Sequence, residues 1–301
     1  MTLPTFYIAG GARCGSTSLE AYCRAHPQVY MSPIKEPNFF SYGCGGVPFA
    51  GPGYDEIYAA AVRDLDEYRL LFKAAGQARA VGEASINYML HPEASAGINT
   101  LTPQARLLFI LRQPVERAWS SFQRSCLQGR EAEMDFLTAW RDDVRRREAG
   151  HWVSLHRYKS LYGKHLRPWF ETFSREQIHV ILFEEFQADT SSVMREVYEF
   201  IGVDGDFRPE TWSVHNQTGE IANPVLRRVW RKSHRARVML RPLLPRAWRG
   251  QSFRFLASDG QVSRKRKPIP ADIKASLTEE LRDDIATLEE LLERDLSLWR
   301  D

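Results

Sequence analysis

The first apolar run of this 301-residue chain leads directly into a glycine-rich turn and then into a helix. Phe6–Ala9 is predicted to be a buried strand, Gly10–Thr17 reads GGARCGST, and Thr17–Ala25 is predicted to be a helix. Glycines let backbone N–H groups approach an anion closely, and the amino end of a helix adds partial positive charge. This order of elements predicts a phosphate-binding loop on a strand-led α/β fold.

Short apolar runs alternate with amphipathic segments along the chain, which is typical of an α/β fold with a mainly parallel sheet. Further strands are predicted at Ala80–Gly82, Leu107–Leu111 and Ile178–Phe183. Further helices are predicted at Leu65–Ala74, Pro114–Leu127, Met134–Arg147, Lys159–Phe173, Ser191–Ile201 and Ala271–Leu292. We expect a P-loop-like parallel sheet with helices on both faces. A single domain over residues 1–301 is expected because the chain can bury one large core.

The composition of the chain indicates where the protein is located and whether it binds a metal. The chain has no run of about 18 apolar residues that would span a membrane, and Met1–Pro4 lacks the pattern of a secretory signal. The four cysteines, Cys14, Cys23, Cys44 and Cys126, show no CxxC spacing. They are interpreted as reduced thiols of a cytoplasmic protein. Histidine spacings that bind metals are absent from the sequence, so we predict no metal.

The loop has the spacing of the nucleotide-binding motif GxxxxGK[ST], but Ser16 stands where that motif has its lysine. ATPases and kinases of this type use the lysine on the β- and γ-phosphates together with Mg²⁺. Arg13, inside the loop, is the available cation instead. The missing lysine argues against nucleoside triphosphate chemistry, and a small-molecule kinase is kept as the alternative function.

A second candidate anion site lies about 100 residues further along the chain. Arg106–Gln123 reads RLLFILRQPVERAWSSFQ, in which a predicted strand ends at Arg112 and a predicted helix begins at Pro114. Ser120 lies about two turns into that helix. An arginine fork matches the geometry of a phosphate better than an ammonium group does.

Both motifs resemble those of the PAPS-dependent sulfotransferase family, in particular its bacterial and heparan-sulfate members. Tyr7–Leu19 resembles the family's 5′-phosphosulfate loop, and Arg112 with Ser120 resembles its 3′-phosphate motif. The resemblance implies the sulfotransferase fold and sulfuryl transfer from PAPS to a hydroxyl or amine, with adenosine 3′,5′-bisphosphate (PAP) as product. It implies that Arg13 stabilises the leaving phosphate. The residues it assigns to the 5′ end of the donor are Gly11, Ala12, Arg13, Cys14, Gly15, Ser16 and Thr17.

A candidate base lies between the two motifs. Transfer to a hydroxyl needs a group that accepts its proton, and Lys35–Phe40 (KEPNFF) resembles the family segment that carries the base. Glu36 is therefore the candidate base and Lys35 a candidate contact for the sulfuryl group. Asn38 replaces a frequent histidine of the family. Glu83 is either a second acid near the acceptor or a residue that holds a loop, and Ala84 follows it where some heparan-type enzymes have lysine.

The last third of the chain contains one strongly basic segment. Pro224–Lys267 holds 14 lysines and arginines against one acidic residue, although the net charge of the whole chain is only +3. This basic segment could flank the acceptor or nucleotide site and attract an anionic polymer, lie on a membrane surface, or be a solvated helix without a partner. A non-enzymatic adaptor built on it is a third functional reading, and no nucleic acid is expected.

The resemblance adds one residue near this segment, because Gly219 fits the loop that closes over the nucleotide in the family. The expected acceptor is a carbohydrate, a glycolipid or lipid-linked molecule, or a small metabolite. The sequence predicts no oligomeric state.

Overall fold

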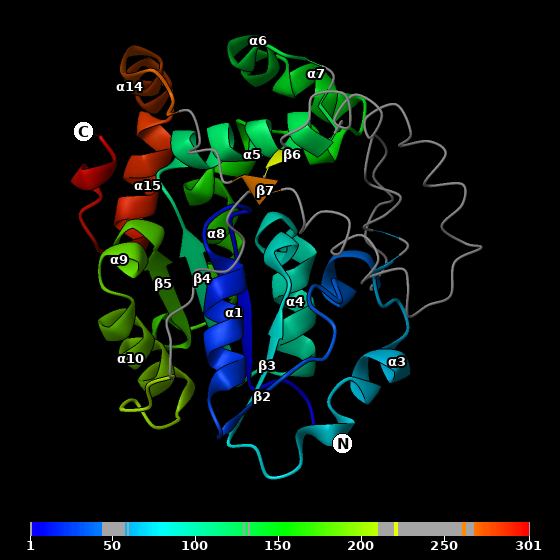
Figure 1. Ribbon diagram of the computed structural model, residues 1–301. Coiled ribbons are helices and arrows are strands. Elements are labelled where there is room, and N and C mark those ends of the chain that lie inside the picture. The colour runs from blue at the N-terminus through cyan, green and yellow to red at the C-terminus, as the bar shows by residue number, and fades with distance from the viewer. Residues whose placement is uncertain are drawn as a thin grey trace.

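A five-stranded parallel sheet forms the centre of the protein in a computed structural model, which describes residues 2–43, 58, 60–128, 130–131, 133–209, 220–221, 261–262 and 268–300 (Figure 1). Its strands are β1 (Phe6–Gly10), β2 (Val29–Met31), β3 (Ala80–Ala84), β4 (Arg106–Leu111) and β5 (Ile178–Leu182). The strand order is β2-β3-β1-β4-β5, and every pairing is parallel.

Helices cover both faces of this sheet (Figure 1). The described α-helices are α1 (Ser16–Ala25), α3 (Leu65–Leu70), α4 (Pro92–Leu101), α5 (Pro114–Gln128), α6 (Phe136–Arg141), α7 (Asp143–Glu148), α8 (Tyr162–Thr172), α9 (Phe183–Ala188), α10 (Thr190–Ile201), α14 (Ala271–Glu279) and α15 (Arg282–Leu292). Short turns of 3-10 or π helix are η1 (Phe39–Gly43), η2 (Lys73–Ala75), η3 (Ile86–Leu90), η4 (Trp152–Ser154), η5 (Tyr158–Ser160), η6 (Arg175–Gln177) and η8 (Ser297–Trp299). Two short strands, β6 (Glu220–Ile221) and β7 (Gln261–Val262), pair antiparallel.

The two faces of β4 enter separate hydrophobic cores. Phe109 packs in a core with side chains from α4, α8 and α15, whereas Ile110 packs with side chains from α1 and α10. Successive side chains of a strand point to opposite faces, so a strand covered on both sides reads as one continuous apolar run. The predicted α/β fold with helices on both faces is confirmed.

The strand order places the candidate loop at a ligand-binding position. The chain passes from β1 to β2 and β3 on one side, and then crosses to β4 and β5 on the other. In open parallel sheets, ligands bind beyond the carboxyl ends of the strands where the order reverses. The loop that follows Gly10, the last residue of β1, lies at this point.

Several predicted elements differ in extent from the structure. The helix predicted at Met134–Arg147 is two helices, α6 and α7, which meet at Asp142. The helix predicted at Ala271–Leu292 is likewise divided, into α14 and α15, and its apolar stripe still enters the core on both sides of the break. The spacing of apolar residues reflects which side chains are buried. It can continue across a break in the backbone hydrogen bonds of a helix, so it does not predict such a break. Strand β2 and helices α4 and α9 were not predicted.

The candidate residue Gly219 lies outside the described residues, and so does the basic segment Pro224–Lys267 except for Gln261–Val262. The single domain over residues 1–301 therefore stays a prediction. Within the described ranges, no helix is both long and apolar enough to cross a membrane.

Candidate functional site

The loop between β1 and α1 has the backbone of an anion cradle. Gly10 (φ 131°), Arg13 (φ 76°) and Gly15 (φ 96°) all adopt the left-handed region. A Cβ at Gly10 would lie 2.3 Å from the carbonyl oxygen of Ile110 on β4, so only glycine lets the two strands close there. The first turn of α1 holds no acidic residue and no side-chain cap, which leaves its amino end electropositive.

The two predicted anion motifs meet in space. Arg13 Nε donates a hydrogen bond to Ser120 Oγ over 3.3 Å, although 107 positions separate the two residues. Ser120 is buried on α5 and Arg13 is half-buried in the loop. Two residues that were predicted to bind opposite ends of one nucleotide are thus in direct contact.

Arg112 lies just beyond β4 and faces a pocket of about 190 Å³. Its guanidinium is 5.0 Å from the centre of the Phe183 ring, and Nη2 pairs with Glu116 over 2.6 Å. Ser120 lines the same pocket. The space is large enough for a phosphate group, and Glu116 lines it together with Arg112.

The far wall of this pocket comes from the carboxyl-terminal part of the chain. Pro268, Ile269, Ala271 and Lys274 line it from the start of α14. Sequence reasoning missed these residues. Their only sequence signal was Lys274 in the first turn of a predicted helix, which an exposed helix face explains equally well.

The candidate base segment is joined to the loop by a hydrogen bond. Lys35 Nζ donates to Thr17 Oγ1 over 2.8 Å. Glu36 follows in a left-handed conformation (φ 60°), and its backbone N–H donates to the carbonyl of Ala84 at the end of β3 over 2.9 Å. Burial raises the pKa of Glu36, against the opposing charge of Lys35. A carboxylate with a raised pKa is a better proton acceptor near neutral pH.

Asn38 fixes the turn that carries Glu36. Its side-chain Nδ2 donates to the Glu36 carbonyl over 3.0 Å, and its backbone N–H donates to Ser85 Oγ over 3.0 Å. Asn38 itself has φ 52°, a conformation that asparagine tolerates better than most residues. The residue that replaces the family's frequent histidine therefore holds the backbone of the candidate base, a contact the sequence did not predict.

Comparison with known proteins identifies the family of this chain. A sequence model of the sulfotransferase family matches residues 55–208. The solved structure of a sulfotransferase from Alicyclobacillus acidocaldarius is 31% identical, with full coverage of both chains and a TM-score of 0.76. This chain belongs to the sulfotransferase family.

Curated relatives of this sulfotransferase family member include two animal enzymes. Carbohydrate sulfotransferase 15 of Rattus norvegicus is 24% identical over 253 residues, which cover 67% of this chain and 44% of that protein. Heparan sulfate glucosamine 3-O-sulfotransferase 3A1 of Mus musculus is 27% identical over 206 residues, which cover 67% and 46%. The chain thus spans about half the length of these curated relatives. The kinase alternative is set aside. The chain belongs to the sulfotransferase family, and its loop has Ser16 where a kinase of this type has lysine.

The family loop contains one thiol, Cys14, which belongs to the core. Its Sγ lies 3.9 Å from the Tyr162 hydroxyl, and burial raises the pKa of the thiol to about 12. Cys14 therefore reaches a ligand only through its backbone. Ala12 lies in the same loop, and Ser16 is the first residue of α1.

Glu83 is fully buried in this sulfotransferase family member, one residue before the end of β3. Its carboxylate accepts hydrogen bonds from the hydroxyls of Tyr68 (2.6 Å), Ser85 (2.6 Å) and Tyr88 (3.1 Å). Burial raises its pKa to about 7, even though these three donors act in the opposite direction. Of the two roles left open by the sequence, this environment favours the one that holds a loop.

Arg117 is a buried cation that sequence reasoning did not single out. Its side chain is fully buried, and it donates from Nε and Nη2 to Ser160 Oγ and from Nη2 to the His156 carbonyl. A Cβ at Gly11 would lie 3.1 Å from Arg117 Cδ, so the guanidinium stem packs directly under the loop. Within the described residues, Arg117 Nη1 has no hydrogen-bond partner.

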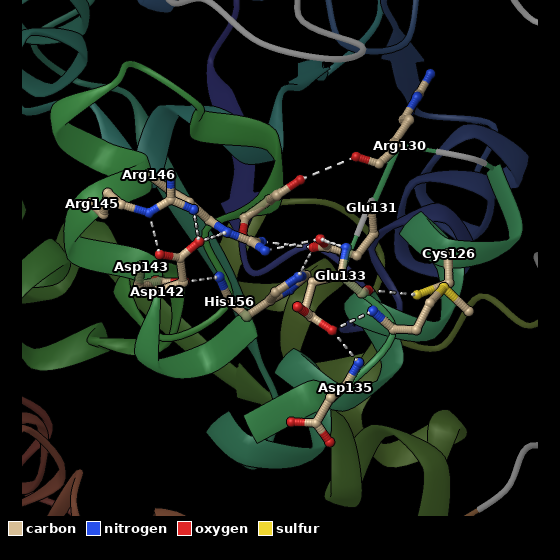
Figure 2. Close-up of polar contacts among 12 residues, drawn as sticks. Cys126, Arg130, Glu131, Glu133, Asp135, Asp142, Asp143, Arg145, Arg146 and His156 are labelled. Atoms are coloured by element: carbon tan, nitrogen blue, oxygen red, sulfur yellow. Dashed lines mark hydrogen bonds and ion pairs between the residues drawn. The ribbon is translucent and has the colours of Figure 1, made fainter. Parts of the chain in front are cut away.

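A second charged cluster lies next to Arg117, and Figure 2 shows Arg146 and His156 converging on Glu131. Arg146 donates to both Glu131 oxygens over 2.8 and 3.0 Å, and His156 Nε2 lies 2.9 Å from Oε2. Burial alone would raise the pKa of Glu131, but these hydrogen bonds outweigh it and lower the pKa to about 2. The paired charges fix the segment before η5. In the described part of the chain, no group of three acidic, histidine or cysteine side chains could hold a metal.

Proposed function

We propose that this protein transfers a sulfuryl group from PAPS to a hydroxyl group of a carbohydrate. The observation that carries the proposal is the 3.3 Å contact between Arg13 in the loop and Ser120 on α5. This contact brings the loop next to the pocket that Arg112 lines. PAPS carries phosphates at both ends of its nucleoside, so its binding would need two neighbouring anion sites of this kind.

The donor would lie across the carboxyl ends of the strands. The backbone of Gly11–Thr17 and the hydroxyls of Ser16 and Thr17 would hold the 5′-phosphosulfate. Arg112 and Ser120 would hold the 3′-phosphate in the 190 Å³ pocket. Gly219 remains a candidate for the loop that covers the nucleotide.

The proposed reaction is an in-line displacement at sulfur. Glu36 accepts the proton of the acceptor hydroxyl while the acceptor oxygen forms its bond to sulfur. The bond between sulfur and the phosphate oxygen breaks, and Arg13 stabilises the negative charge that develops on the departing PAP. Lys35, whose Nζ donates to Thr17 Oγ1, lies beside the loop and would contact the sulfuryl oxygens.

The carbohydrate acceptor is supported by the names of the curated relatives, which are a carbohydrate sulfotransferase and a heparan sulfate sulfotransferase. An amine acceptor or a lipid-linked saccharide fits the same chemistry. A cytoplasmic location is also proposed. It is supported by Cys14, Cys23 and Cys126, which form no disulfide bond with one another in the described part of the chain.

Two measurements test this function. Calorimetry should detect PAP binding without added metal, and it should detect no magnesium-dependent binding of ATP. PAPS offered with a panel of saccharides should then give a product that gains one sulfuryl group by mass spectrometry. Magnesium-linked ATP binding with no heat from PAP would restore the kinase alternative.

A further inference from the structure

Gln113 lies between β4 and α5, directly after Arg112, and its side chain is buried. Its Oε1 accepts from the backbone N–H of Glu116 over 2.7 Å, as an amino-terminal cap of α5 does. Its Nε2 donates to Thr278 Oγ1 over 2.9 Å and to the Trp299 carbonyl over 3.2 Å. A carboxamide has two N–H donors. Both are therefore used on the carboxyl-terminal part of the chain.

One carboxylate closes these contacts into a network. The backbone N–H of Gln113 donates to Glu184 Oε1 over 2.9 Å, and Glu184 is the second residue of α9. The other oxygen of this carboxylate accepts from the indole Nε1 of Trp299 over 3.3 Å, and Trp299 is fully buried in η8. We refer to Gln113, Glu184, Thr278 and Trp299 as the Gln113 network. It joins the start of α5 to α9, α14 and η8.

The Gln113 network borders the pocket that Arg112 lines. Arg112 and Glu116, before and after Gln113 in the chain, lie on one wall. Lys274 lies on the opposite wall, and Thr278 follows it by one turn on the same helix, α14. The bond from Gln113 to Thr278 therefore fixes one wall relative to the other, although 165 positions separate the two residues.

The network also supports the contact between Arg112 and an aromatic side chain. The Arg112 guanidinium lies 5.0 Å from the centre of the Phe183 ring. The next residue after each of these two, Gln113 and Glu184, are hydrogen-bonded to each other. This bond holds the cation and the aromatic face together.

Hydrogen bonds give this contact a direction that apolar packing lacks. Helix α14 packs against α5, and apolar contacts alone would allow it to shift, because many positions bury a similar area. A buried carboxamide loses more when it is left unpaired than it gains from an ordinary hydrogen bond. Positions of α14 that do not pair Thr278 with Gln113 are therefore disfavoured, and the second wall is held in one register.

We propose that Gln113 is a positioning residue of the donor site. Through Thr278 and Trp299 it holds α14 where both walls of the pocket contact the same phosphate, so that docking of α14 becomes part of donor binding. This inference rests on the proposed function, which assigns the 3′-phosphate to this pocket, and it adds the carboxyl-terminal helix and its anchor to that site.

The test uses a substitution that keeps the shape of the side chain. Thr278→Val removes the hydroxyl that accepts from Gln113, and calorimetry measures the binding of PAP and of adenosine 5′-phosphate, which lacks the 3′-phosphate. PAP should bind at least about fivefold more weakly, the effect of leaving one buried donor unsatisfied. Adenosine 5′-phosphate should bind as it does to wild type. The KM for PAPS should rise with the loss of PAP binding, and kcat at saturating PAPS should change much less.

Three further variants complete the comparison. Gln113→Met removes both side-chain donors and should weaken PAP binding more than Thr278→Val does. Thr278→Ser keeps the hydroxyl and should restore PAP binding. Thr287→Val makes the same change on α15, where the hydroxyl donates to the Asp283 carbonyl of its own helix, and should leave the binding of both nucleotides unchanged.

Hydrogen exchange tests the link between the donor and α14. In wild type, PAP should slow amide exchange in Ala271–Glu279 by at least about fivefold, the lower end of the usual coupling between two sites. Adenosine 5′-phosphate should slow it far less, because it leaves the pocket empty. In the absence of nucleotide, Thr278→Val should exchange faster than wild type over the same helix.

Three results would overturn the inference: equal losses of both nucleotides in Thr278→Val, unchanged PAP binding in that variant, or exchange of α14 that PAP does not slow. Faster exchange together with unchanged PAP binding would assign the Gln113 network to stability alone. The wild-type samples separate this failure from that of the proposed function. Wild type that binds PAP and sulfates a saccharide would keep the proposed function, whereas wild type that binds no PAP would remove both.

Discussion

The two flanks of the phosphate loop differ in the charges that they bring to it. The flank of β4 and α5 supplies cations and a hydroxyl, namely Arg112, Arg117 and Ser120. The flank of β2 and β3 supplies two carboxylates, Glu36 and Glu83, and one cation, Lys35. Under the proposed function, nucleotide binding and proton transfer would therefore depend on different elements of the fold. A substitution on one flank should then leave the function of the other in place.

The largest expected effect on turnover tests the carboxylate flank. Glu36→Gln removes the proton acceptor and should lower kcat by roughly 10²- to 10⁴-fold, the usual contribution of a general base. PAP binding, measured by calorimetry, should remain within about twofold of wild type, because no donor-binding residue changes. A variant that still turns over at the wild-type rate would exclude Glu36 as the base.

The next largest effect tests the cationic flank. Arg112→Ala should weaken binding of PAP by roughly 10- to 100-fold, the value of a lost charged hydrogen bond. Adenosine 5′-phosphate, which lacks the 3′-phosphate, should be affected far less. Arg282→Ala, which removes an exposed arginine paired on the surface with Glu279, is the matched control. Equal losses for both nucleotides would remove Arg112 from the 3′-phosphate site.

The smallest effect on turnover is expected at Glu83, whose role concerns stability. Its folded pKa of about 7 lies above the ordinary value of a glutamate, so the native state binds this proton more tightly than the unfolded chain does. Stability from this group is therefore full at low pH and declines as the pH rises toward 7. Glu83→Gln should flatten the dependence of the free energy of unfolding on pH between 5 and 7, measured by urea denaturation.

The exposed Glu93→Gln on α4 is the control for that measurement and should keep the wild-type slope. An unchanged slope in Glu83→Gln would mean that the buried carboxyl is not the group that titrates. A large loss of turnover in Glu83→Gln would return Glu83 to the candidate acids.

The sequence predicted the parts of the site that depend on local order. The loop at Gly10–Thr17 follows from a strand, glycines and a helix in succession, and Arg112 follows from the end of an apolar run. Contacts between distant segments were harder to predict. Nothing in the sequence around Thr278 indicates that α14 lies beside Gln113, because that placement depends on packing between α5 and α14.

The same limit explains the elements that were missed. Strand β2 has three residues, too few for an alternating pattern, and α9 begins directly where β5 ends. Glu83 and Asn38 were recognised as residues of interest, but their hydrogen-bond partners come from α3, η3 and the end of β3. Polar side chains inside a fold receive their roles from tertiary neighbours, which residue patterns do not encode.

The left-handed backbone at Arg13, Glu36 and Asn38 has a consequence for the evolution of this enzyme. Each non-glycine residue held at positive φ costs roughly 1 kcal/mol or more. Glycine at any of these positions would relieve that cost and stabilise the protein. Under the proposed function, it would also remove the cation at the leaving group, the base, or the amide that holds the base. Selection for heat tolerance alone would therefore erode the chemistry at these three positions, and their persistence in a lineage would indicate that activity is what is being maintained.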